Sequence, residues 1–214
     1  MIRGRDMKKS RIAIISILLI LCLLAFSSCA TTARWQNQYS DTDGENVGTV
    51  NNNPSAKYIV YAALDGSGNL ISAGSATETV EYAVVGYTGL VAELTIPSQY
   101  DSKNVTKVLV AAPYSAYKCY SNGTSYTDDD ARLANNTVVK SITFGSNVEF
   151  VGAGVCAGMI NVETVSFLCT TGVEIGANAF AACSSLTAVS FACSSASAVI
   201  GAGNFTGITP TYAS

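Results

Sequence analysis

The sequence predicts a mainly β fold: a short solenoid of rungs, each made of a strand and a turn or short helix, with an N-terminal cap of β-strands. A six-residue pattern recurs as V-K-S-I-T-F, V-E-T-V-S-F and L-T-A-V-S-F, starting at residues 139, 162 and 186. A second block, Val-Gly-Ala or Ile-Gly-Ala, follows each copy, with its glycine at 152, 176 and 201. A fixed period in the twenties is typical of a solenoid.

Residues 1–28 have the layout of an export signal. Five basic residues precede an apolar run from Ile12 to Phe26, and small residues follow it. This run of 15 residues is shorter than the roughly 20 that a membrane-spanning helix needs. A cleaved signal peptide is therefore favoured over a retained membrane anchor.

Cys29 lies where a lipoprotein-type signal would be cleaved. The segment A-F-S-S-C that ends at Cys29 resembles the lipobox of bacterial lipoproteins, in which the cysteine becomes the new N-terminus and receives a diacylglyceryl group. Ordinary cleavage after Ala30 is the alternative, because Ser28 and Ala30 form a small-x-small pattern. We expect lipidation at Cys29. The protein is then exported and anchored by lipid at the outer membrane or cell surface, or secreted if Cys29 is not lipidated.

Three further segments follow the signal. Residues 29–56 are rich in Asn, Thr, Asp, Ser and Gly, which predicts a flexible tether. Residues 57–97 alternate β-branched or aromatic runs with turn clusters and predict the β-rich cap, which is needed because a bare terminal rung leaves its apolar face wet. Residues 98–214 hold the solenoid, with an inserted loop at 120–132.

The repeated apolar positions are expected to point inward and to stack on their equivalents in the next rung. They recur 23 to 25 residues apart. No rung can bury such a face alone, so the positions predict one continuous core. The three columns are Ile142, Val165 and Val189; Cys156, Phe180 and Phe205; and Met159, Cys183 and Ile208.

These rungs resemble the BspA-type leucine-rich repeat, whose pattern is roughly L-x-x-I-x-I-P followed by V-x-x-I-G-x-x-A-F-x-x-C-x-x-L. Residues 172–191 read G-V-E-I-G-A-N-A-F-A-A-C-S-S-L-T-A-V-S-F, and the similarity extends over about residues 82–208. It implies a leucine-rich-repeat solenoid on a surface lipoprotein or secreted protein of bacteria or protists. Such proteins are associated with adhesion to host proteins and other cells, and the family has no catalytic residues to carry over.

Charge and the lack of histidine exclude several function classes. The chain has 12 basic and 15 acidic residues; residues 1–28 hold 5 and 1 of them, which leaves 7 and 14, a net charge of −7. This balance argues against nucleic-acid binding, which needs basic patches. The absence of histidine excludes Ser-His-Asp and Cys-His catalytic sets and His-ligated metals, although not paired-carboxylate chemistry. We expect no enzyme, no metal and no cofactor.

Five cysteines follow Cys29, an odd number that rules out complete internal pairing. Cys156 and Cys183 are expected to behave as small buried apolar residues. Cys169 and Cys193 each lie two residues after a strand phenylalanine, on neighbouring rungs about 4.8 Å apart. This spacing allows a disulfide between them, although stacked parallel side chains rarely have the required torsion. The alternative is two free thiols.

A tyrosine cluster at the inserted loop is the candidate contact patch. Exposed tyrosines favour protein recognition and loops often carry function, whereas the alternative reading of these residues is β-propensity and half-burial. The acidic run 128–130 in the same loop is expected to be solvated, because three consecutive carboxylates cannot all reach one cation. The patch consists of Tyr114, Tyr117, Tyr120 and Tyr126.

The combined reading is a non-catalytic, adhesin-like cell-surface module that presents a leucine-rich-repeat face for protein–protein interaction. Its expected partner is a protein on a host or other cell surface, with membrane contact through the lipid anchor only and no nucleic acid. The alternative is a structural envelope component that self-associates, or a remnant of a longer repeat array, because little polar sequence follows the last rung.

Overall fold

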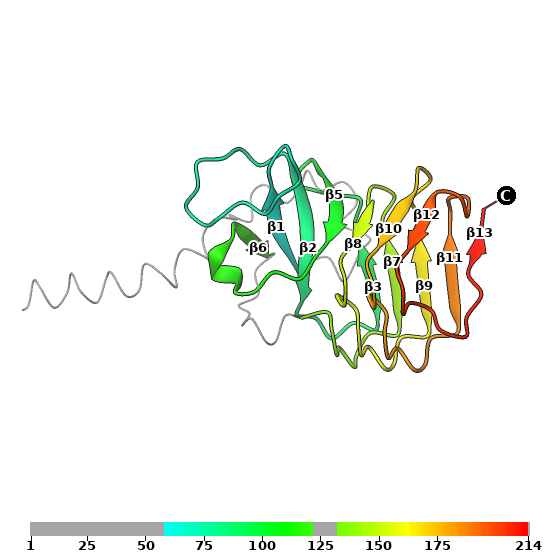
Figure 1. Ribbon diagram of the computed structural model, residues 1–214. Coiled ribbons are helices and arrows are strands. Elements are labelled where there is room, and N and C mark those ends of the chain that lie inside the picture. Colours follow the sequence, from blue (N-terminus) through cyan, green and yellow to red (C-terminus); the bar gives the residue numbers. More distant parts are fainter. Residues whose placement is uncertain (1–57, 122–131, 214) are drawn as a thin grey trace, which may run out of the picture. The chain divides into compact units, whose positions relative to one another are not determined.

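Two β-sheets form the framework of the computed structural model, which describes residues 58–121 and 132–213 (Figure 1). The first sheet has the strand order β12-β10-β8-β5-β2-β1-β6, with β4 paired beside β5, and the second has the order β13-β11-β9-β7-β3. The predicted mainly β fold is thus confirmed. The strands of the first sheet are β1 (Ile59–Leu64), β2 (Glu81–Tyr87), β4 (Gln99–Tyr100), β5 (Lys103–Val108), β6 (Cys119–Ser121), β8 (Phe150–Val151), β10 (Val173–Ile175) and β12 (Ala198–Ile200). Those of the second are β3 (Glu93–Ile96), β7 (Ser141–Phe144), β9 (Thr164–Phe167), β11 (Ala188–Phe191) and β13 (Thr211–Tyr212).

The chain winds between the two sheets and forms a solenoid. Each turn contributes one strand to the second sheet and then one to the first: β3 and β5, β7 and β8, β9 and β10, and β11 and β12, after which β13 begins a fifth turn. Successive strands are parallel, so that Ile142 lies opposite Val165, and Val165 opposite Val189. The predicted solenoid is confirmed, and its regular rungs are joined by turns. The 3₁₀ helix η4 (Tyr114–Ala116) lies ahead of them in the chain.

Strand alternation explains why these segments pair in this way. In β7, β9 and β11 the second and fourth residues are buried and the first and third are not. Side chains alternate across a strand, so the apolar residue and the phenylalanine point inward while the hydroxyl residue between them points outward. Aromatic rings stack down the inside of the sheet: ring centroids are 4.7 Å apart between Phe167 and Phe191, and 5.1 Å apart between Phe191 and Tyr212.

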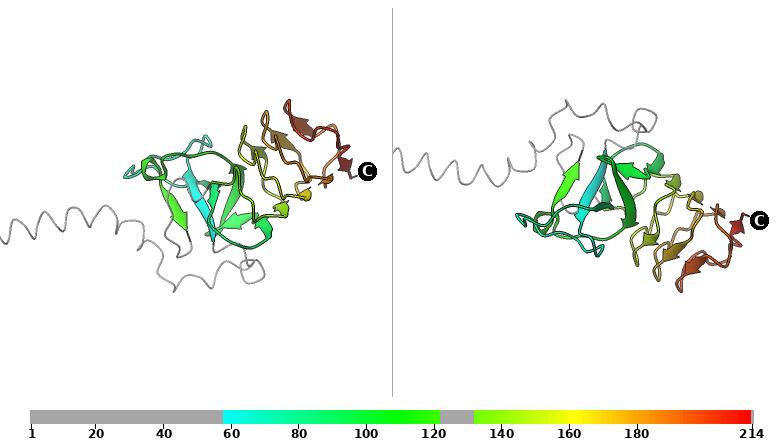
Figure 2. Two further views of the ribbon diagram at one scale, coloured as in Figure 1. Left: turned by 90° about the horizontal axis from the view of Figure 1, so that it is seen from below. Right: turned by 90° about the horizontal axis from the view of Figure 1, so that it is seen from above.

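The cap is continuous with the solenoid. Strands β1 and β2 pair antiparallel, and β2 pairs in parallel with β5 of the first turn. Figure 2 shows the cyan and green strands of the cap followed by the yellow to red turns of the solenoid. All six residues of β1 are buried, because both faces of the strand are covered. On one face lies a cluster that includes Val60, Ala62 and Tyr114. On the other, Tyr61 stacks on Tyr100 with ring centroids 3.8 Å apart.

Strand pairing places two segments differently from the predicted divisions. Strand β3 lies within 57–97, the segment expected to form the cap, yet it pairs in parallel with β7 and opens the first solenoid turn. Strand β6 includes Tyr120 and Ser121, which were expected in the inserted loop 120–132, yet it pairs with β1 at the edge of the cap sheet. Neither pairing is marked in the local sequence, because each joins strands more than 40 residues apart.

Most of the predicted inward positions are buried. The column of Ile142, Val165 and Val189 and the column of Cys156, Phe180 and Phe205 are all at most 6% exposed. In the third column Met159 is fully buried, whereas Cys183 and Ile208 are partly exposed. Ile208 lies in the last described turn, where no further rung of the described residues covers it.

Candidate functional site

The outward face of the second sheet carries a column of hydroxyl side chains. One residue from each strand lies in register with the next across the whole sheet. Of the five, all but Thr211 are half-buried, and the Ser190 hydroxyl donates to Ser166 Oγ at 3.1 Å. The column, here called the hydroxyl face, consists of Thr95, Thr143, Ser166, Ser190 and Thr211.

This face presents short polar side chains. Each hydroxyl can donate one hydrogen bond and accept two. Neighbouring strands are about 4.8 Å apart, so the face offers evenly spaced polar contacts. The adjacent outward column reads Glu93, Ser141, Thr164 and Ala188, which adds a single carboxylate.

The predicted tyrosine patch is dispersed. Tyr114 is 4% exposed and donates a hydrogen bond from its hydroxyl to the Val85 carbonyl at 3.0 Å, so it is a core residue and does not belong to an exposed patch. Tyr117 is half-buried against the same core cluster. Tyr120 meets the ring of Tyr82 edge-on, with centroids 5.8 Å apart. Tyr126 lies outside the described residues.

Four of the five described cysteines fall into two neighbouring pairs, and Cys119 lies apart from them in the cap. Cys169 and Cys193 are buried on adjacent turns as free thiols that interact through a hydrogen bond. Burial, followed by the proximity of Cys193, raises the pKa of Cys169 to about 11. The Cys183 thiol donates to the Cys156 carbonyl at 3.3 Å. The disulfide between Cys169 and Cys193 stays a prediction, and alkylation without reductant followed by intact-mass analysis tests it.

Several predicted features lie outside the described residues: the signal at 1–28, Cys29, the tether and the acidic run 128–130. In the part of the chain that the structure describes, no three Cys, Asp or Glu side chains are grouped to hold a metal ion. Nor does any helix in residues 58–121 or 132–213 have the length and apolarity to cross a membrane.

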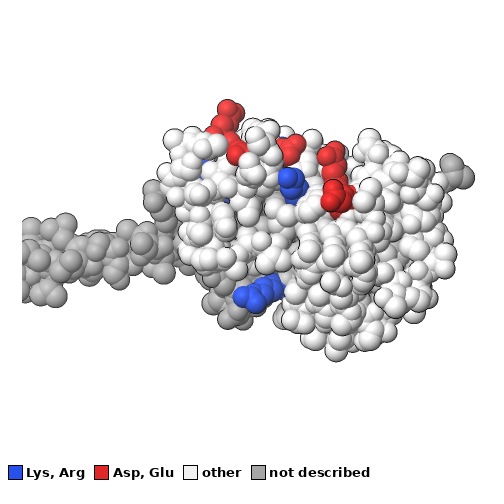
Figure 3. Space-filling model, viewed as in Figure 1, with Lys and Arg blue, Asp and Glu red and all other residues white. Residues whose placement is uncertain are grey.

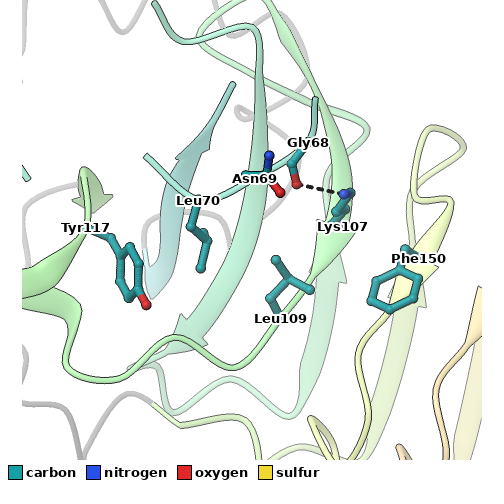
Figure 4. A pocket seen from close by; sticks show the side chains of 7 residues that line it. All are labelled: Gly68, Asn69, Leu70, Lys107, Leu109, Tyr117 and Phe150. Carbon is teal, nitrogen blue, oxygen red and sulfur yellow. Dashed lines mark hydrogen bonds between the residues drawn. The ribbon is translucent and has the colours of Figure 1, made fainter. Parts of the chain in front are cut away.

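Sequence reasoning missed a pocket of about 490 Å³ beside the first turns (Figure 4). Its lining comes from four separate segments, so no local pattern marks it. Lys107 lies on its wall and donates a hydrogen bond from Nζ to the Gly68 carbonyl at 2.7 Å. The lining residues are Gly68, Asn69, Leu70, Lys107, Leu109, Tyr117 and Phe150.

No family model matches the chain, and no curated protein matches it. Among solved structures, the crystal structure of a leucine-rich cell surface protein from Faecalibacterium prausnitzii A2-165 is similar, with a TM-score of 0.34 and 20% sequence identity. The match covers 59% of this chain and 29% of that protein.

Proposed function

We propose that this protein is a non-catalytic, adhesin-like cell-surface module that binds another protein through the hydroxyl face. The observation that carries the proposal is the register of Thr95, Thr143, Ser166, Ser190 and Thr211 across five parallel strands. Such a face supplies a row of hydrogen-bonding groups at little conformational cost, because Ser and Thr side chains are short.

Location at the cell surface is part of the same proposal. The N-terminal layout and the lipobox-like segment support export and lipid anchoring at Cys29. The repeat pattern that resembles the BspA-type leucine-rich repeat supports a role in contact with host proteins or other cells. The absence of histidine in the whole chain supports a role without acid–base catalysis of the common kinds.

The proposal is tested by displaying the full chain on a non-adherent bacterial host and measuring cell attachment to a panel of immobilised extracellular matrix proteins and to epithelial cells. We expect attachment above the level of the host without the chain to at least one surface. Attachment equal to that host on every surface, with display verified by a surface antibody, would count against an adhesin.

Self-association is the second candidate function. Strands β12 and β13 end the two sheets, and one edge of each lacks a strand partner among the described residues. No charged residue follows Glu174, and in the view of Figure 3 the surface over β11 and β13 carries no acidic or basic side chain. Natural edge strands are usually protected by charged side chains against pairing with another molecule. These uncharged edges therefore suit strand pairing with a second copy of the chain. Light scattering on the purified chain discriminates between the two candidate functions, because a strictly monomeric protein would argue against self-association.

A further inference from the structure

The pocket beside the first turns is an apolar cavity with one cation. Figure 4 shows Leu70, Leu109, Tyr117 and Phe150 around the cavity, with Lys107 on its wall. Its volume of about 490 Å³ falls in the range of about 300–1,000 Å³ that is usual for ligand pockets. The pocket is distinct from the hydroxyl face, because its lining strands β5 and β8 belong to the first sheet.

The apolar wall is anchored in the fold. Leu70, Leu109 and Tyr117 pack on the buried cluster of the cap. The backbone N–H of Leu109 donates to the Val84 carbonyl at 2.9 Å, and that of Tyr117 donates to the Tyr114 carbonyl at 3.1 Å. Phe150 pairs with Lys107 across β8 and β5. These side chains remain partly accessible and their backbones are fixed, so the pocket is an open, largely apolar depression that can receive an apolar group without rearrangement of the backbone.

The ammonium group of Lys107 is held in place and still has hydrogen-bond donors available for a ligand. The hydrogen bond from Nζ to Gly68 uses one of the three donors of the ammonium group. No described carboxylate lies in ion-pair contact with Lys107. The nearby Asp65 carboxylate is engaged in its own turn, where Oδ1 accepts from the backbone N–H groups of Asn69 and Ser67, each at 2.9 Å. These hydrogen bonds, with the Asn69 contribution first, hold the pKa of Asp65 below its ordinary value, and the nearby charge of Lys107 contributes to this lowering.

We propose that this pocket receives an apolar side chain of a protein ligand that has a carboxylate on a neighbouring residue. The apolar side chain enters among Leu70, Leu109 and Phe150, and the carboxylate accepts a charge-assisted hydrogen bond from Lys107. A protein segment suits the pocket better than a free fatty acid, because the lining residues are only half-buried and leave the remainder of a small ligand in water. The inference rests on the proposed role in protein binding but concerns a separate surface.

The test uses NMR titration of the ¹⁵N-labelled full chain in detergent with capped peptides Gly-Ser-Phe-Asp-Gly-Ser, the Phe-Asn analogue and the Ala-Asp analogue. We expect saturable shifts at the amides of Gly68, Asn69, Leu109 and Phe150. The Phe-Asp peptide should bind about fivefold tighter than the Phe-Asn analogue, which corresponds to about 1 kcal/mol for a half-exposed charge pair. The Ala-Asp analogue should bind more weakly than either.

Matched variants separate the effect of the Lys107 charge on peptide binding from any effect of the substitution on folding. Lys107→Met keeps most of the side-chain stem and should abolish the preference for Asp over Asn, whereas Lys107→Arg should retain it. Lys140→Met, just before β7 of the second sheet, should leave the preference unchanged. Equal binding of the Asp and Asn peptides, no saturable shifts, or tighter binding of free hexanoate than of the peptide would overturn the inference. Cell attachment reports on the hydroxyl face independently, so either proposal can fail without the other.

Discussion

Phe144 and Phe167 stack in parallel across neighbouring turns, with ring centroids 4.6 Å apart and planes 5° apart. Phe191 continues the stack below Phe167. Phe167 is therefore covered on both sides, and we expect Phe167→Ala to lower the free energy of unfolding by about 3–5 kcal/mol, the usual range for a buried phenylalanine. Urea unfolding followed by circular dichroism measures it.

Tyr212→Ala is the matched control for this substitution. Tyr212 stacks on Phe191 from one side only and is partly exposed, so its loss should cost clearly less than that of Phe167. Equal losses for the two variants would mean that the aromatic stack is not what stabilises the turns.

The hydroxyl of Tyr114 is buried and bonded to the Val85 carbonyl. Tyr114→Phe should therefore reduce the free energy of unfolding by about 1 kcal/mol, because the carbonyl loses a buried donor, and should leave cell attachment unchanged. Thermal unfolding and the attachment assay measure the two effects. Reduced cell attachment without a change in stability would instead indicate that Tyr114 belongs to a contact surface.

Alkaline pH should destabilise the reduced protein. The ordinary pKa of a cysteine thiol is 9.0, and burial raises that of Cys169 to about 11 and that of Cys156 further. Between pH 9 and about 11 the unfolded chain releases protons that the folded chain retains, so the stability present below pH 9 is lost as pH rises.

Unfolding of the reduced protein at pH 8, 9, 10 and 11 measures this dependence. We expect Cys169→Ala to flatten the curve by up to about 2 kcal/mol, after allowance for solvent screening near the surface. A curve for Cys169→Ala that parallels the wild type would show that this thiol has the same pKa in the folded and unfolded protein.

Cys29→Ala should release the protein from the membrane. Without the cysteine no diacylglyceryl group can be attached, and a single cleaved export signal provides no lasting anchor. Fractionation of cells that express each form, followed by immunoblotting, measures the distribution. A variant that stays in the membrane fraction would point to the retained anchor helix instead.

The solenoid could be predicted from sequence because each turn repeats the same local pattern. The stacked position of Val165, between Ile142 and Val189, follows from spacing alone. The burial of Tyr114 and the pairing of β6 with β1 could not be predicted in this way, since both depend on contacts between the cap and a segment more than 25 residues away. The pocket around Lys107 was missed for the same reason. Tyr212 extends the aromatic stack, but the residues before it do not repeat the six-residue pattern that ends at Phe144, Phe167 and Phe191.

The central claim concerns which face binds. Thr143→Lys combined with Ser166→Lys places two long cations at the centre of the hydroxyl face, while Glu174→Lys places a cation on the exposed outward side of β10 in the other sheet. Attachment of cells that display each variant at equal surface density is the most direct measurement. The account predicts that attachment falls to the level of the bare host for the double variant and is retained for Glu174→Lys; full attachment by the double variant would contradict it.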